Sequence, residues 1–158
     1  MSLAFAIYTL SQKKCPAYGA VALGLAVFIG LYLLDALALN RIGMEGAWKT
    51  GIDLDAEWHR LLNGGEENRM LMLFNVAAFV PFGIALAVFL ETMGMEKWRS
   101  LGRVALVASG LTLCVECIQL VFRVGFFEVT DLVLNCAGAG MGGMIVIGIR
   151  SVFTKYVR

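Results

Sequence analysis

The sequence is short of charge. Lys, Arg, Asp and Glu together make up 16% of its 158 residues, whereas hydrophobic residues make up 59%. An average soluble domain is about 25% charged and about 45–50% apolar. Together with a mean hydropathy of +0.79, this shortage excludes an ordinary soluble domain and predicts a membrane protein.

Other features are missing as well. There is no block of Lys and Arg and the net charge is only +1, which argues against nucleic acid as a partner. His59 is the single histidine and the four cysteines match no zinc-ligand spacing, so we expect neither a metal site nor a cofactor. The first residues, MSLAFAIYTL, lack a basic start, and we expect no cleaved signal peptide.

Long apolar runs are what the sequence has instead. A transmembrane helix needs about 20 mostly apolar residues. Four segments have this length, at about 18–39, 70–90, 104–122 and 131–149. We therefore expect one all-α domain over residues 1–158, a polytopic membrane protein whose four transmembrane helices form a small bundle.

The distribution of basic residues predicts the orientation of these spans in the membrane. With a cytoplasmic N-terminus, most of the thirteen Lys and Arg lie inside: Lys13, Lys14, Lys97, Arg99, Arg103, Arg150, Lys155 and Arg158. Fewer lie outside: Arg41, Lys49, Arg60, Arg69 and Arg123. Basic residues prefer cytoplasmic loops, so we expect both termini to be cytoplasmic.

The predicted outer loop, residues 40–69, contains a short amphipathic segment at about 53–63. Asp53 can cap a helix start and Gly64 can end the helix. Its apolar residues fall on one side: Leu54, Trp58, Leu61 and Leu62. We expect this helix to lie on the outer membrane surface, with a solvated loop helix as the alternative. In either case His59 is expected to be a surface residue.

Polar residues recur on the inner faces of the predicted helices. Glu116, Gln119 and Arg123 are spaced i, i+3 and i+7, and therefore share one helix face. Asp131 and Asn135, spaced i and i+4, share a face of the next helix. Both faces are polar near the predicted outer end of their helices.

These groups also agree in depth. At about 1.5 Å per residue, Glu116 lies about 20 Å from the cytoplasmic side of a core about 30 Å thick. The same rise places Asn135, Asn75 and Asp35 roughly 6 to 8 Å below the outer surface. Polar groups inside membrane helices usually face the bundle interior or a wet cavity, so we expect an outer-leaflet pocket that binds a ligand.

A purely structural role is the alternative for each residue. Asn75, Gln119 and Asn135 could simply make interhelical hydrogen bonds. Glu116 would then need a partner such as Arg123, or a bound proton, to offset its burial. Asp35, one helical turn from the interface, could simply reach water.

Two glycines continue the face of Asp131 and Asn135. Gly138 and Gly142 form a GxxxG pattern, which lets another helix backbone approach closely. Packing alone can explain this pattern, and an oligomer formed through the same face is also possible.

Three stretches in this order resemble the VanZ-like family of small bacterial membrane proteins. They are NVAAFVPFG at 75–83, the segment from Ser109 to the ECIQ of 116–119, and DLVLNCAG at 131–138. The resemblance covers about residues 70–150. It implies a cell-envelope protein in the bacterial cytoplasmic membrane, because the family takes its name from a member associated with resistance to teicoplanin, a lipid-tailed glycopeptide antibiotic.

The sequence departs from the family pattern at one position. Similar proteins usually carry an arginine about six residues before the aspartate and an acidic residue three before it. Glu128 matches the acidic position, but Gly125 stands where the arginine is expected and Arg123 lies eight residues before Asp131.

Two functions follow. In the first, the pocket binds an amphiphilic molecule at the membrane surface: a membrane lipid, a lipid-linked cell-wall precursor or a lipoglycopeptide. In the second, Glu116 and Asp131 act as general acid and base of an intramembrane enzyme on a lipid-linked substrate. The sequence offers no nucleophile beside a base and no phosphate loop, so we favour the binding function.

Overall fold

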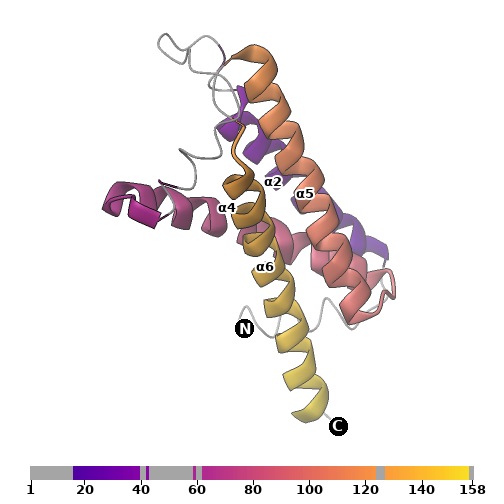
Figure 1. Ribbon diagram of the computed structural model, residues 1–158. Helices are drawn as coiled ribbons and strands as arrows, with labels where there is room; N and C mark the ends of the chain where they lie inside the picture. Colours follow the sequence, from indigo (N-terminus) through magenta and orange to yellow (C-terminus); the bar gives the residue numbers. More distant parts are fainter. Residues whose placement is uncertain (1–15, 40–41, 43–58, 60–61, 124–126, 157–158) are drawn as a thin grey trace.

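Four long helices make up most of the computed structural model, which describes residues 16–39, 42, 59, 62–123 and 127–156. They are α2 (Pro16–Leu37), α4 (Glu66–Thr92), α5 (Lys97–Phe122) and α6 (Val129–Tyr156) (Figure 1). Each is long and apolar enough to cross a membrane. The expected all-α membrane fold with four spans is thus confirmed.

The helices extend beyond the apolar spans. α4 begins at Glu66 rather than near residue 70, α5 begins at Lys97 rather than near 104, and α6 ends at Tyr156 rather than near 149. Apolar runs locate the part of a helix that meets lipid, whereas the helix itself continues through charged residues. Glu66 and Glu67 also favour the positive end of the α4 dipole.

The amphipathic helix expected at about 53–63 lies almost entirely outside the described residues. Its surface or loop location therefore stays a prediction. His59 is described, and its side chain is exposed as expected.

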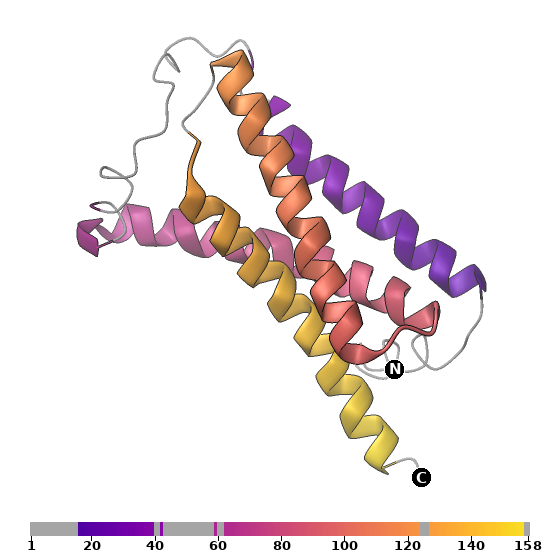
Figure 2. The same cartoon turned by 45° about the vertical axis from the view of Figure 1, so that its right-hand side comes forward.

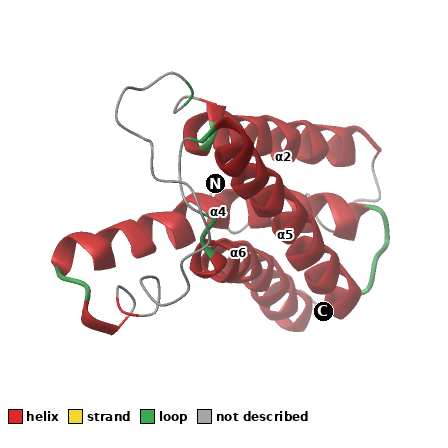
Figure 3. Cartoon of the chain, turned by 45° about the horizontal axis from the view of Figure 1, so that its top comes forward, coloured by secondary structure: helices red, strands yellow, loops and turns green. Residues whose placement is uncertain are grey.

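The bundle has two distinct ends. At the upper end in Figure 1, α2 and α5 finish and α6 begins; at the lower end, α4 and α6 finish and α5 begins. α4 crosses behind α5 and α6 (Figure 2). In Figure 3, which brings the upper end forward, α5 lies between α2 and α6.

The tightest contact joins α4 to α6. A Cβ atom added to Gly138 would overlap the carbonyl oxygen of Val76, and one added to Gly142 would overlap that of Val80. Gly83 lies just as closely against the Ala139 carbonyl. The GxxxG face therefore packs within the chain, where α4 already covers it, and an oligomer through the same face remains untested.

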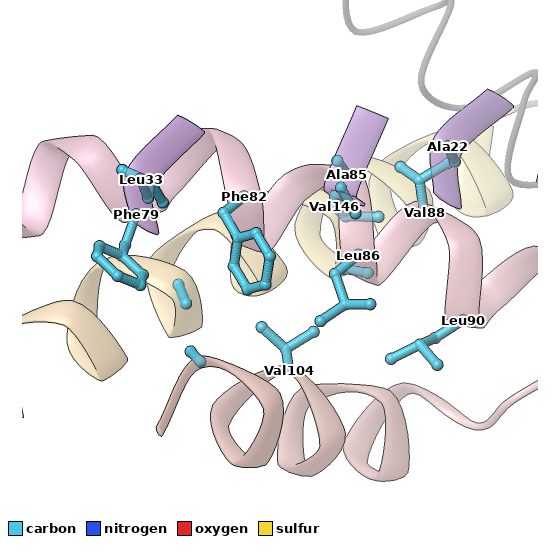
Figure 4. Close-up of a cluster of buried hydrophobic side chains, with 14 residues drawn as sticks. Ala22, Leu33, Phe79, Phe82, Ala85, Leu86, Val88, Leu90, Val104 and Val146 are labelled. Carbon is cyan, nitrogen blue, oxygen red and sulfur yellow. The ribbon is translucent and has the colours of Figure 1, made fainter. Parts of the chain in front are cut away.

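Larger side chains fill the rest of the interior. Phe79 is fully buried and meets Phe82 edge to face, with ring centroids 6.1 Å apart. Leu33 of α2, Val104 of α5 and Val146 of α6 belong to the same buried apolar cluster (Figure 4). The middle of the bundle is therefore apolar and separates the upper end from the lower end.

The glycine contact makes a matched pair of substitutions informative. We expect Gly138→Ala to lower the free energy of unfolding by about 1–3 kcal/mol, because the methyl group must push α4 away. Gly140 has no atom within 4 Å of such a methyl group, so Gly140→Ala should be neutral or slightly stabilising. Unfolding in detergent measures both, and equal effects would contradict the packing described.

Candidate functional site

Polar side chains of α4, α5 and α6 gather at the upper end of the bundle. Three of them are almost completely buried: Glu116 is 1% exposed, Gln119 5% and Asn135 2%. Asn75 and Asp131 are half-buried. We call these five residues the upper polar cluster, and all five were candidate ligand-binding residues in the sequence.

Glu116 is bound to the start of α6. Its Oε2 accepts the backbone N–H of Glu128 at 2.8 Å, and Glu128 directly precedes the first residue of the helix. The first N–H groups of a helix have no intrahelical partner and carry the positive end of the dipole. A carboxylate at this position therefore stabilises the helix start and is itself stabilised.

Arg123 does not serve as the partner of Glu116 in the described contacts. It is exposed and ends α5 in the left-handed conformation, with φ at 56°. Its backbone N–H returns to the carbonyl groups of Gln119 and Leu120. Arg123 thus occupies a turn position more often held by glycine.

Gln119 binds the backbone at the end of α2, as Glu116 binds the backbone at the start of α6. Its Nε2 donates to the carbonyl oxygen of Leu37 at 2.8 Å. Leu37 is the last residue of α2, and the last carbonyl groups of a helix lack intrahelical donors. This bond fastens the outermost helix of the bundle to α5.

Asn75 connects α4 to α6. Its Nδ2 donates to Oδ1 of Asp131 at 2.7 Å. Asp131 lies in the first turn of α6, where the helix dipole favours a carboxylate. This hydrogen bond fixes the position of α4 along its axis relative to the beginning of α6.

Asn135 differs from its neighbours. It lies one turn below Asp131 on α6, and its Oδ1 has no hydrogen-bond partner among the described residues. Leaving a buried acceptor unsatisfied costs about 1–3 kcal/mol. Its burial therefore has no explanation within the described contacts.

The sequence interpretation missed a further polar residue beside this cluster. Thr112 lies one turn before Glu116 on α5, is 0% exposed, and also has an unsatisfied oxygen in the described structure. Ser109 lies one turn before Thr112 on the same face, and its Oγ is 3.0 Å from Sγ of Cys136. The sequence pattern could have identified Thr112, because residues 109, 112, 116 and 119 share the i, i+3, i+7, i+10 spacing of one helix face.

Two further predictions from the sequence concern Asp35 and the outer-leaflet pocket. Asp35 is exposed on α2 and takes no part in the described contacts of the cluster. A surface hollow at the start of α4 is lined by Glu66, Glu67, Met70 and Leu71, none of which belongs to the upper polar cluster. The expected pocket within the cluster stays a prediction.

The two carboxylates proposed as acid and base lie on neighbouring helices at this end. Each has its own donor, the Glu128 N–H for Glu116 and the Asn75 amide for Asp131. No group of three His, Cys, Asp or Glu side chains in the described part of the chain is placed to hold a metal ion.

Four membrane-length helices with buried polar groups at one end define a small polytopic membrane protein with a one-sided polar cluster. The model of the VanZ/LLP1 family matches residues 22–152, so the chain belongs to this family. A curated relative, Protein VanZ of Enterococcus faecium, is 35% identical over 71 residues. The match covers 45% of this chain and 40% of the relative, and no solved structure matches.

The capping role of Glu116 predicts a specific pattern of stabilities. Glu116→Met leaves the Glu128 N–H without its acceptor and should lower the free energy of unfolding by about 1–3 kcal/mol. Glu116→Gln keeps an acceptor oxygen and should lower it by less. Combining either change with Arg123→Gln should give effects that add within about 0.5 kcal/mol, because Arg123 makes no described contact with Glu116. A coupling above about 1 kcal/mol would instead establish the Glu116–Arg123 pair.

Proposed function

We propose that this chain is a cell-envelope protein whose upper polar cluster binds the polar part of an amphiphilic molecule at the membrane surface. The ligand class comprises lipid-linked cell-wall precursors and lipoglycopeptides such as teicoplanin. Membership of the VanZ/LLP1 family supports this proposal, since the family is named after a protein associated with teicoplanin resistance.

The unsatisfied amide oxygen of Asn135 carries the proposal. Glu116 and Gln119 each bind the backbone at a helix end, and Asn75 binds Asp131, so their burial has a structural explanation. Asn135 has none among the described residues. Unsatisfied buried polar groups in native proteins call for a ligand, an ion, water or a functional role, and a ligand hydroxyl or amide would supply the missing donor.

Charge supports an outward-facing upper end. The described basic residues of α5 and α6 are concentrated at the lower end: Lys97, Arg99, Arg103, Arg150 and Lys155. Basic residues prefer the cytoplasmic side, so this distribution favours an orientation with both termini inside, and the family match supports a bacterial cytoplasmic membrane. The cluster would then meet molecules in the outer leaflet.

An accessible cysteine at each end tests the orientation. In a chain whose native cysteines are replaced by alanine, His59→Cys should react with an impermeant maleimide on intact cells. Thr154→Cys, exposed near the end of α6, should react only after the cells are opened. The reverse pattern would turn the cluster toward the cytoplasm and refute a cell-surface role.

Two substitutions that remove unsatisfied oxygens test the ligand site. Asn135→Leu should leave the free energy of unfolding unchanged or raise it by up to about 1 kcal/mol, because a buried orphan acceptor disappears. The variant should nevertheless lose teicoplanin resistance in a susceptible host and lose the amphiphile that copurifies with the wild type, detected by mass spectrometry.

Ser100→Ala is the matched control. It removes another unsatisfied buried oxygen, but at the lower end of the bundle, so stability should behave in the same way while resistance and copurification persist. A stable Asn135→Leu protein with wild-type resistance and the same bound amphiphile would refute the site.

A further inference from the structure

A second polar cluster lies at the lower end of the bundle. Glu91, in the last turn of α4, is 2% exposed, and its Oε2 accepts a hydrogen bond from Nη1 of Arg150 at 3.0 Å. The Arg150 side chain itself is 28% exposed. The guanidinium group is therefore anchored from inside and reaches the surface.

Three helices meet directly above this pair. A Cβ atom on Gly143 would lie 3.0 Å from Leu101 Cδ1 and 4.0 Å from Ala87 Cβ, which places α4, α5 and α6 in contact there. Glu91 lies one turn beyond Ala87, Arg150 two turns beyond Gly143, and Lys97 one turn before Leu101. All three charged residues therefore lie between this three-helix contact and the lower end of the bundle.

Lys97 binds the residue next to Arg150 on α6. Its Nζ donates to Oγ of Ser151 at 2.7 Å, and Ser151 directly follows Arg150 on α6. An ammonium group has three donors, and this bond uses one of them. A fixed ammonium group and an anchored guanidinium group, from two different helices, therefore present donors at the same surface.

From this geometry we infer that Lys97 and Arg150 bind the phosphate group of an anionic phospholipid. Guanidinium and ammonium groups are the preferred donors to phosphate oxygens. The start of α5 adds to the positive field, since the side chain of its N-cap residue Glu96 makes no capping hydrogen bond. Arg103 and Lys155 add further positive charge at this end.

The surroundings favour a lipid over free phosphate. Trp98, next to Lys97, is 78% exposed, and tryptophan is enriched at membrane–water interfaces. Val152, next to Ser151, is 54% exposed, so apolar surface adjoins the basic groups. Basic sites between transmembrane helices are suited to anionic headgroups for this reason.

Quenching of Trp98 fluorescence tests the site in the complete chain. With Trp48→Phe and Trp58→Phe, Trp98 is the single tryptophan. The protein is reconstituted into phosphatidylcholine vesicles that contain increasing fractions of brominated phosphatidylglycerol or, separately, brominated phosphatidylcholine. We expect the brominated phosphatidylglycerol to quench Trp98 at the lower mole fraction.

Two variants that each remove one positive charge separate a defined site from diffuse attraction. Lys97→Gln should weaken the preference for phosphatidylglycerol about tenfold, because it removes a charge-assisted hydrogen bond to the lipid phosphate. Arg99→Gln lies in the same turn of α5, but this side chain is 80% exposed and paired with Glu96, so the preference should persist.

Three outcomes would overturn the inference. The first is equal quenching by both brominated lipids in the wild type. The second is an equal loss of preference in Lys97→Gln and Arg99→Gln, which would indicate a general surface potential. The third is removal of the preference by millimolar inorganic phosphate at constant ionic strength, which would assign the site to free phosphate.

Discussion

The backbone contact between α4 and α6 determines where both polar clusters lie. Gly138 and Gly142 bring α6 against the carbonyl groups of Val76 and Val80, and Gly83 does the same from the other side. Asn75 directly precedes Val76 and therefore meets Asp131 near the start of α6. Farther along the same pair of helices Glu91 meets Arg150. A larger residue at the glycines would separate the helices and break both pairings together. Because lipid gives helices no hydrophobic reason to associate, such close packing and the hydrogen bonds that it permits must hold the bundle.

The apolar layer between the clusters keeps them independent. Phe79, Phe82, Val104 and Val146 occupy the middle of the bundle. A charge in the upper cluster is therefore not connected by polar contacts to the ion pair at the lower end, at least within the described residues. No chain of described polar contacts joins the two ends of the bundle.

Much of this architecture could be predicted from the sequence, because membrane spans and depth depend on one coordinate, the distance along a helix. A rise of about 1.5 Å per residue placed Glu116, Asn135 and Asn75 near one end, where they lie in the structure. Orientation around the helix axis was harder to predict. Asp35 was a candidate ligand-binding residue, but its side chain is exposed on α2. The contact of Glu116 with a backbone N–H was also beyond prediction, because side-chain patterns do not show backbone donors. Arg123, the partner considered from the sequence, makes no described contact with Glu116.

The buried polar residues of this family member fall into two energetic groups. Glu116 and Gln119 bind backbone groups that every helix end leaves unsatisfied, so their polarity supports the fold and would be retained without any ligand. Asn135 satisfies no helix end in the described structure, yet it lies one turn below Asp131 on the same face. An apolar residue there would avoid the cost of the unsatisfied oxygen, so stability alone does not account for the asparagine. The capped helix ends supply a rigid frame, and within that frame Asn135 and its neighbour Thr112 are the residues whose unsatisfied oxygens have most to gain from a bound partner.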